Sequence, residues 1–200
     1  MAEPQRCAWC GEDPLYIEYH DKEWGVPEKD PQQLFERLVL EGMQAGLSWL
    51  TVLKKRAHMR EVFFAFDMCK LAQADATQVD QWLADAGIIR HRGKLQAMLN
   101  NARLSVVRTD FADWLWSFAP PLNLEAVARA DQVPAYTAAS IAMSKALKKA
   151  GYQFVGPRIC YAFMQSVGMV NDHIEGCWRH APCRTLAMQT NIEADCPGGQ

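Results

Sequence analysis

Helix starts and stops recur along almost the whole chain, and they constrain its fold more than any other feature. Asp30 before Pro31 is typical of an N-cap followed by a first-turn proline, and apolar residues then return at i,i+4 spacing. Ser48 and Thr77, which are residue types that cap helices, precede similar patterns. No segment alternates convincingly between apolar and polar residues between hairpin turns. The sequence therefore predicts an all-α fold of about eight helices and no sheet.

Caps and apolar periods place six of these helices along the chain. Gly87, Gly151 and Gly168 suit helix ends because glycine adopts the left-handed conformation found there. The pair Pro120-Pro121 marks either a lobe boundary or an ordinary turn. We expect one helical domain of two lobes over residues 1–180 and a flexible tail over 181–200, which lacks periodicity. The six helices are expected to begin near Pro31, Ser48, Thr77, Leu95, Thr137 and Gly156.

Length and charge exclude several classes of function. A chain of 200 residues suffices for one domain with its own core. Its 21 basic and 23 acidic side chains give a formal net charge of −2, which excludes a strongly basic nucleic-acid binder but not a local basic surface. The sequence has no run of about 18 apolar residues and no export signal, so we expect a cytoplasmic protein that does not enter a membrane.

Cysteine and histidine residues gather near both ends of the chain. Cys7 and Cys10 form a C-x-x-C pair, and His173 and Cys177 stand at an H-x3-C spacing that places both on one helical face or around one turn. Thiolate and imidazole donors suit zinc, and four of them close a tetrahedral site. The alternative is reduced core cysteines and surface histidines. The clustering favours a metal site, but the pattern does not choose among the candidates. These are Cys7, Cys10, His20, His173, Cys177, His180 and Cys183.

A glycine-containing turn with basic side chains lies between two of the expected helices. It has the sequence A-G-I-I-R-H-R-G-K over residues 86–94, which is the layout of a helix–hairpin–helix. The amides of such a hairpin and of the following helix hold a DNA phosphate, and Arg90, Arg92 and Lys94 add positive charge. The alternative is an ordinary turn with a solvated basic face. The spacing of the two glycines favours phosphate binding.

A carboxylate lies near an aromatic residue at the end of an apolar helix. Glu41 is followed by small residues that permit close approach, and then by Trp49. Such a pair can hold a flat heterocycle by hydrogen bonding and stacking. Spacing alone favours the plainer interpretation, in which Glu41 is solvated and Trp49 belongs to the core. The same holds for residues 15–25, where tyrosines and Trp24 lie among charged residues.

Several long segments together resemble the DNA-3-methyladenine glycosylase I family. They are residues 6–9, 13–27, 41–49, 86–94 and 144–173, and the resemblance runs from about Arg6 to Trp178. It implies a helix–hairpin–helix glycosylase fold and a monofunctional enzyme of base excision repair. Such an enzyme excises 3-methyladenine hydrolytically from double-stranded alkylated DNA and leaves an abasic site. The free base is its product, and we expect a monomer.

The same resemblance implies a set of site residues. One structural zinc per chain joins the N- and C-terminal segments and has as its ligands Cys7, His20, His173 and Cys177. Cys10, His180 and Cys183 are then not zinc ligands. Glu41 is the catalytic residue, and the base is bound by Tyr16, Tyr19, Trp49 and Trp9. DNA is contacted by Gly46, Leu47, Arg90, Arg92, Gly93 and Lys94.

The chemistry of the lesion fits this assignment. A base must leave the stack before its glycosidic bond can be cut, and a lesion that pairs badly costs less to extrude. Adenine alkylated at N3 carries positive charge, which weakens that bond and favours an indole face and a carboxylate over neutral surroundings. Glu41 would therefore recognise the base and stabilise charge while water attacks the sugar.

Two other classes of function compete with this interpretation. A glycosylase-lyase or endonuclease of the same fold needs a lysine nucleophile at the hairpin exit. That place falls near His91 in this chain, and Lys94 is better interpreted as a phosphate contact. A non-catalytic, zinc-stapled DNA-binding module would keep the basic hairpin, but it has no reason to bury Glu41 beside Trp49.

Overall fold

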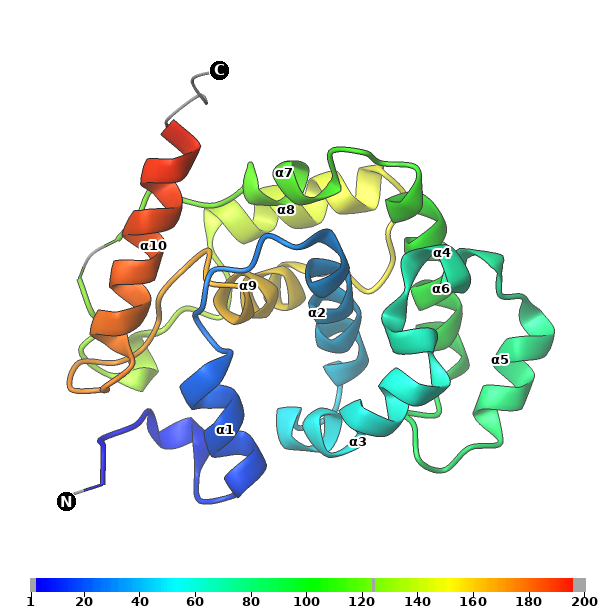
Figure 1. The fold of residues 1–200 in the computed structure, drawn as a ribbon, viewed down its shortest axis with the longest axis horizontal. Helices are drawn as coiled ribbons and strands as arrows, with labels where there is room; N and C mark the ends of the chain where they lie inside the picture. Colours follow the sequence, from blue (N-terminus) through cyan, green and yellow to red (C-terminus); the bar gives the residue numbers. More distant parts are fainter. Residues whose placement is uncertain (1–2, 124, 196–200) are drawn as a thin grey trace. The chain divides into compact units, whose positions relative to one another are not determined.

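The computed structural model describes residues 3–123 and 125–195, with the side chains of the last helix described to residue 190, and this part of the chain is helical (Figure 1). No strand occurs in it, and one isolated bridge pairs Val127 with Ile174. The all-α prediction is confirmed, with ten α-helices in the described part instead of about eight. They are α1 Pro14–Lys22, α2 Pro31–Gln44, α3 Trp49–Val62, α4 Met68–Gln73, α5 Ala76–Leu83, α6 Arg92–Val106, α7 Phe111–Trp116, α8 Ala138–Lys149, α9 Pro157–Ser166 and α10 His180–Asp195. Three 3-10 helices are η1 Ala8–Cys10, η2 Phe64–Phe66 and η3 Ala130–Gln132.

Side-chain caps start most of these helices where the sequence predicts. The Asp30 carboxylate accepts from the amide of Gln33, and the Ser48 hydroxyl accepts from the amide of Thr51. Two starts differ from the prediction. Asp75 caps α5 in place of Thr77, and α6 begins before Leu95 because His91 caps it. In both helices a side chain upstream of the expected start accepts from the free amides of the first turn, two residues before Thr77 and four before Leu95.

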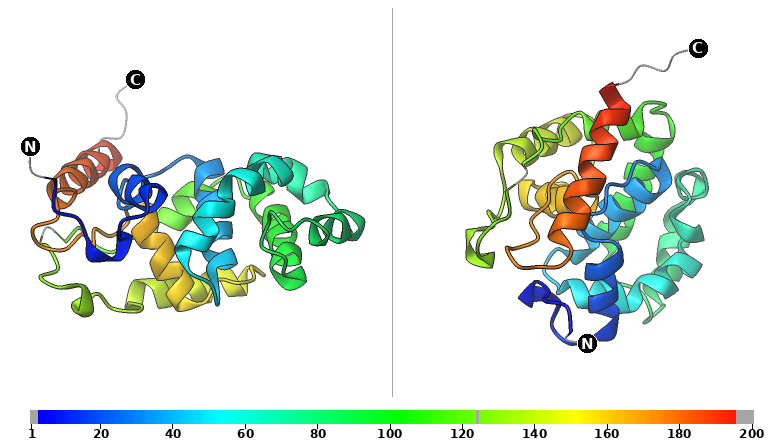
Figure 2. Two further views of the ribbon diagram at one scale, coloured as in Figure 1. Left: turned by 90° about the horizontal axis from the view of Figure 1, so that it is seen from below. Right: turned by 60° about the vertical axis from the view of Figure 1, so that its left-hand side comes forward.

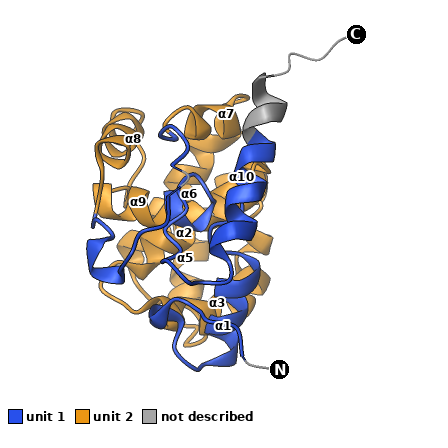
Figure 3. Cartoon of the chain, turned by 90° about the vertical axis from the view of Figure 1, so that its left-hand side faces the viewer, with its two compact units in different colours: residues 1–28, 119–135, 164–200 blue, residues 29–118, 136–163 orange. Residues whose placement is uncertain are grey.

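The chain forms two compact units, drawn in different colours in Figure 3. Unit 1 consists of residues 1–28, 119–135 and 164–200, and unit 2 consists of residues 29–118 and 136–163. The chain first returns to unit 1 directly before Pro120 and Pro121. In unit 1 the start of the chain meets the segment before α10, where the Trp178 amide donates to the Gln5 carbonyl at 3.0 Å (Figure 2).

Unit 2 is built on α2, whose residues from Leu34 to Met43 are all buried. A helix buried on every side must pair its charges. Glu36 does so by accepting from Arg56 Nε at 2.8 Å and from Arg60 Nε at 2.9 Å. The ion pairs hold α3 against α2, and the same α2 carries Glu41 one turn further on.

Residues 181–195 differ from the expected tail, because α10 runs from His180 to Asp195. Its buried side includes Cys183 at 0% exposed and Ala187 at 7%. Small side chains at i,i+4 spacing give a weak apolar signal, which explains why periodicity did not predict this helix. Residues 196–200 of the expected tail lie outside the described residues. No helix in the described ranges is long and apolar enough to cross a membrane.

Candidate functional site

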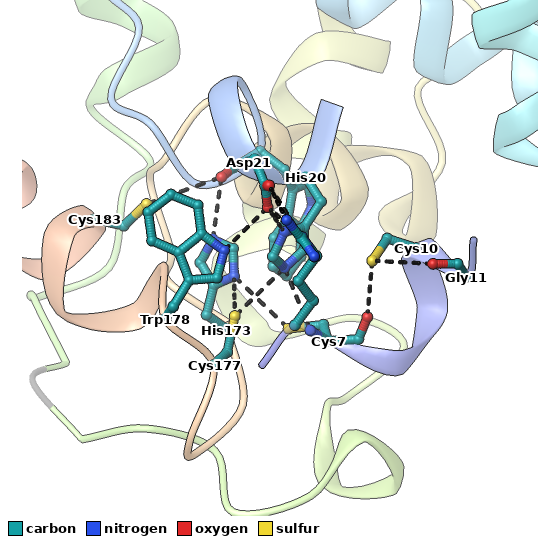
Figure 4. Close-up of polar contacts among 11 residues, drawn as sticks. Cys7, Cys10, Gly11, His20, Asp21, His173, Cys177, Trp178 and Cys183 are labelled. Carbon is teal, nitrogen blue, oxygen red and sulfur yellow. Dashed lines mark hydrogen bonds and ion pairs between the residues drawn. The ribbon is translucent and has the colours of Figure 1, made fainter. Parts of the chain in front are cut away.

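Four buried side chains converge in unit 1 to form a cluster of sulfur and nitrogen atoms (Figure 4). The cluster consists of Cys7, His20, His173 and Cys177, and its candidate ligand atoms all lie within 4.8 Å of one another. The Cys177 sulfur lies 3.4 Å from both His20 Nε2 and His173 Nδ1, and the Cys7 sulfur lies 3.7 Å from His173 Nδ1. Ligands of a tetrahedral zinc ion stand about 3.5 Å apart, given the usual Zn–S and Zn–N lengths. The donor set and its spacing fit a metal ion.

Short local structures place these ligands. Cys7 precedes η1, and His20 lies in the last turn of α1. His173 and Cys177 lie in the loop before α10, where the Cys177 amide donates to the Ile174 carbonyl at 3.0 Å. The H-x3-C pair is therefore brought together by a turn and not by one face of a helix. Cys10, His180 and Cys183 are outside the cluster, as the family resemblance implied.

A second set of contacts orients the two imidazoles. His20 Nδ1 lies 2.7 Å from Asp21 Oδ1, and His173 Nε2 lies 3.2 Å from the Trp24 carbonyl oxygen. Each ring thus presents its other nitrogen to the cluster, which is the usual arrangement around a metal-binding histidine. Asp21 is itself held by the Arg6 guanidinium, at 2.8 to 3.0 Å, and by Trp178 Nε1, at 3.1 Å.

Sequence analysis did not single out Asp21, Arg6 or Trp178, although Asp21 directly follows a candidate ligand. Burial raises the pKa of the Asp21 carboxyl, but hydrogen bonds from Arg6, His20 and Trp178 outweigh it and lower the pKa below its usual value. A carboxylate held ionised in this way is a permanent acceptor for the His20 N–H.

The pKa values of the two thiols in the cluster are shifted in opposite directions. The hydrogen bond from Cys7 lowers the pKa of Cys177, and His173 and His20 lower it further. The same bond and burial raise the pKa of Cys7. Two neighbouring sulfurs cannot both ionise easily without a cation. A divalent ion would permit two thiolates.

An aromatic group in unit 1 adjoins the cluster. The Trp9 ring centroid lies 5.1 Å from that of Tyr16, 6.4 Å from that of Tyr19 and 4.9 Å from that of Trp24. Three of these are predicted base-binding residues, and Trp24 is an addition. The Trp24 ring stands edge-on to the His173 ring at 4.6 Å between centroids, so the aromatic group contacts the cysteine–histidine cluster directly.

In unit 2, the predicted carboxylate of Glu41 lies at the C-terminal end of α2, and the predicted indole of Trp49 lies at the N-terminal end of α3. Glu41 lies in the last turn of α2 and is 4% exposed, and Trp49 begins α3 and is 7% exposed. The interpretation of Glu41 as a solvated surface residue is therefore wrong. Burying a carboxylate is costly, which makes Glu41 a candidate for a functional role.

The connection between α2 and α3 contains the predicted DNA-contacting residues Gly46 and Leu47. Gly46 has a φ of +79°, which favours glycine, and open space surrounds the position of its missing Cβ. Leu47 is 41% exposed, although it is a large apolar residue. The turn thus exposes the apolar side chain of Leu47 to solvent next to Gly46, which has open space at its Cβ position.

The predicted hairpin connects α5 to α6 and is anchored to α3. The Gly87 amide donates to Asp85 Oδ1 at 2.7 Å, and Asp85 Oδ2 pairs with His58 Nε2 at 2.7 Å. A Cβ on Gly87 would lie only 2.3 Å from the His58 ring, so any larger residue would displace that ring. The φ of Gly87 is not left-handed, unlike those of Gly151 and Gly168, so the expected left-handed helix stop is wrong at this position. Ile88 and Ile89 are buried beneath the turn. These contacts give the hairpin a defined conformation.

The basic residues of the hairpin are arranged differently from one another. Arg90 is exposed, whereas the exposed Arg92 pairs with Asp80 at 2.6 Å. His91 Nδ1 accepts from the amide of Lys94 at 3.2 Å and thereby caps α6. Gly93 lies half-buried against the His91 ring. Among the described residues of the hairpin, Arg90 is thus the arginine that faces solvent and forms no ion pair.

The prediction that the Lys94 side chain contacts a phosphate is corrected by its position in the structure. Its side chain is 6% exposed, and its amino group donates to the carbonyl oxygens of Met43 and Ala45 at the end of α2. Burial lowers the pKa of Lys94. The amino group is turned inward because helix-end carbonyls, which lack partners of their own, attract it.

Comparisons with known proteins agree with these features. The model of the methyladenine glycosylase family matches residues 9–180. DNA-3-methyladenine glycosylase 1 of Escherichia coli (strain K12) is 52% identical over 179 residues, which are 86% of this chain and 95% of that protein. The chain belongs to the methyladenine glycosylase family.

Solved structures support this family membership. A crystal structure of 3-methyladenine DNA glycosylase I superposes with a TM-score of 0.84 at 52% identity, covering 87% of this chain and 98% of that one. A variant of such an enzyme in complex with 3-methyladenine superposes with a TM-score of 0.80 at 33% identity, covering 86% and 96%. The described fold is therefore that of the methyladenine glycosylases.

Besides the hairpin between α5 and α6, unit 2 has another short turn between helices, which the sequence patterns alone did not predict. Residues 150–156 join α8 to α9 in unit 2. The Val155 carbonyl accepts from Ser144 Oγ at 2.6 Å and from Cys160 Sγ at 3.4 Å, so both flanking helices hold one carbonyl. Phe154 has a left-handed φ of +54°. Gly151 and Gly156 are the sequence signals for this turn, because they mark the end of one expected helix and the start of the next.

Proposed function

We propose that this protein excises 3-methyladenine from double-stranded alkylated DNA by hydrolysis of the glycosidic bond and leaves an abasic site. The observation that carries the proposal is the burial of Glu41 in the last turn of α2, directly before an exposed Gly46–Leu47 turn. A buried carboxylate suits a cationic base, and an exposed apolar turn suits the gap that a flipped nucleotide leaves. The relatives that the chain resembles over most of its length carry the name of this activity.

In this proposal Glu41 is the catalytic residue and contacts the base. An anionic carboxylate stabilises the positive charge of N3-methyladenine and of the developing sugar cation, which gives the enzyme a preference over neutral adenine. Trp49 offers an indole face for stacking, and the electron-rich face attracts a cationic ring. Tyr16, Tyr19 and Trp9 remain proposed base-binding residues, because they form one aromatic group in unit 1.

The proposed DNA contacts are Gly46 and Leu47 of the α2–α3 turn together with Arg90, Arg92 and Gly93 of the hairpin. Arg90 and Arg92 are exposed, so their guanidinium groups can meet phosphate oxygens. Arg92 would exchange Asp80 for a phosphate, since their ion pair is solvent-exposed and weak.

The cluster in unit 1 is proposed to bind one zinc ion through Cys7, His20, His173 and Cys177. Four protein ligands leave no open position for water, so the ion would be structural. When bound, it would supply folding free energy by joining the start of the chain to the loop before α10. Cys7 and Cys177 would balance its charge as thiolates.

A base-release assay on methylated duplex DNA tests the proposed activity. We expect the protein to release 3-methyladenine and to leave an equal amount of abasic sites. DNA binding without base release would identify a DNA-binding module instead. Strand breaks equal in amount to the released base would identify a lyase. Unmethylated duplex is the control, and it should release no adenine.

A further inference from the structure

The end of α2 is held by a lysine from another helix. Lys94 Nζ donates to the Met43 carbonyl at 2.8 Å and to the Ala45 carbonyl at 2.6 Å. The carbonyls of a last helical turn have no partner within the helix and carry partial negative charge. Lys94 itself is the third residue of α6, where the helix end is positive and disfavours a cation. Pointing toward the end of α2 moves the ammonium from an unfavourable helix end to a favourable one.

The other two carbonyls of this turn are occupied by backbone amides. The Gly42 carbonyl accepts from the amide of Ala45 at 3.3 Å, and the Gln44 carbonyl accepts from the amide of Leu47 at 2.6 Å. The four consecutive carbonyls of residues 42–45 therefore each have a donor, and Lys94 supplies two of the four bonds.

The turn that follows is not held by packing at its tip. Apart from Gly46 and its two chain neighbours, no heavy atom of the described residues lies within 4 Å of the position of a Gly46 Cβ, and Leu47 is 41% exposed. Instead, polar contacts hold both sides of it. Lys94 binds the carbonyl directly before Gly46, and on the far side Ser48 Oγ accepts from the amide of Thr51 at 3.2 Å. Lys94 thus contacts the backbone at the point where the chain leaves α2.

We propose that Lys94 is a positioning residue that presets the turn of residues 45–48 for entry into damaged DNA. This inference rests on the proposed function, in which Gly46 and Leu47 contact the DNA where the base has left. A turn fixed before binding loses less conformational entropy when it enters the duplex. Glu41 lies in the last turn of α2, but packing holds it in place because the helix is buried from Leu34 to Met43, so we expect the free base to bind without Lys94.

The substitution Lys94→Met tests the proposal, because it keeps the length and apolar stem of the side chain and removes the ammonium. We expect kcat/KM for excision from methylated duplex to fall about tenfold to a hundredfold, as displaced contacting groups typically cause. The Kd for free 3-methyladenine, measured by calorimetry, should stay at the parent value. Equal losses in both measurements, or no loss in excision, would overturn the proposal.

A double-mutant cycle with Leu47→Ala separates positioning from general stability. If Lys94 acts through the turn, K94M combined with L47A should lose no more excision than L47A alone. Additive losses would show that Lys94 acts elsewhere and would overturn the proposal. Lys94→Arg, which retains charge and donors, enters the same cycle if K94M fails to fold, and it should recover part of the excision.

Lys70→Met is the matched control for loss of a lysine charge. Lys70 lies in the same unit but is exposed, and its 3.9 Å ion pair with Asp67 leaves α2 untouched. It should excise as the parent does. Excision by the parent protein tests the proposed function itself, whereas only the ratio of variant to parent tests Lys94. The two failures are therefore distinguishable.

Discussion

Asp21 Oδ1 lies 2.7 Å from Nδ1 of His20, the residue directly before it, and thereby directs His20 Nε2 into the cysteine–histidine cluster. Arg6 and Trp178 hold the carboxylate from two other directions. The cluster thus has an outer layer of contacts drawn from the same two chain segments as its ligands. Such layers fix the tautomer of a metal-binding histidine and strengthen its bond to the metal.

Asp21→Asn should weaken zinc binding about tenfold to a hundredfold, since outer contacts of this kind commonly contribute that much. The variant keeps the size of the side chain and removes its charge. Competition with a chelating indicator measures the zinc affinity. Glu18→Gln, on the exposed side of the same helix, is the control and should bind zinc as the parent does. An unchanged zinc affinity in D21N would contradict the role of Asp21.

Cys7→Ser and His173→Ala should each lower zinc content and thermal stability together, because metal-binding free energy becomes folding free energy. Cys10→Ser is the matched control, since the Cys10 thiol donates to the backbone carbonyls of Cys7, at 3.1 Å, and Gly11, at 4.0 Å, and is not part of the cluster. Metal analysis and thermal unfolding measure the two effects. One full zinc equivalent in the C7S/H173A double variant would exclude this ligand set.

Glu41→Gln should fold as the parent does and lose most excision of 3-methyladenine. The amide keeps the shape of the buried side chain but removes the charge that stabilises a cationic base. Single-turnover base release measures the chemical step, and circular dichroism checks the fold. Glu61→Gln, an exposed residue of α3, serves as control and should remain active. Excision at the parent rate by E41Q would place the catalytic group elsewhere.

Trp49→Ala should weaken binding of the free base by about 1–3 kcal/mol, the usual contribution of one stacked aromatic face. Calorimetric titration with 3-methyladenine measures this loss. Trp114 lies in α7 of the same unit and packs against Phe118 and Arg108. Trp114→Ala is therefore the control for loss of an aromatic residue, and its affinity for the base should match that of the parent. Equal affinities of W49A and the parent would remove Trp49 from the base-binding residues.

The protein should leave abasic sites in unbroken strands. A lyase needs a lysine amine that attacks the sugar, and the amino group of Lys94 is turned inward onto two backbone carbonyls. Incubation with methylated duplex and borohydride, analysed without alkali, should trap no protein–DNA adduct. A trapped adduct would reveal a Schiff base and a lyase activity. A glycosylase-lyase of known activity serves as the positive control for trapping.

The local helical order was predictable from the sequence because its causes are local. Asp30 and Ser48 cap helices through amides three residues away, so their effect needs no distant partner. The cap predicted at Thr77 is instead Asp75, and α6 begins before Leu95 because His91 caps it. The helix α10 was missed because its buried side includes small residues, whose burial depends on the rest of unit 1.

The sequence by itself determined that thiol and imidazole donors gather at both chain ends and that a carboxylate precedes a glycine–leucine turn. The residue pattern left open which cysteines face the histidines, and the family resemblance chose Cys7 and Cys177, which the structure brings together. Only the tertiary structure decided that Glu41 is buried and that Lys94 points inward. These outcomes depend on which surfaces pack together far along the chain. Side-chain direction follows the balance between desolvation and available partners, and that balance exists only once the helices have met.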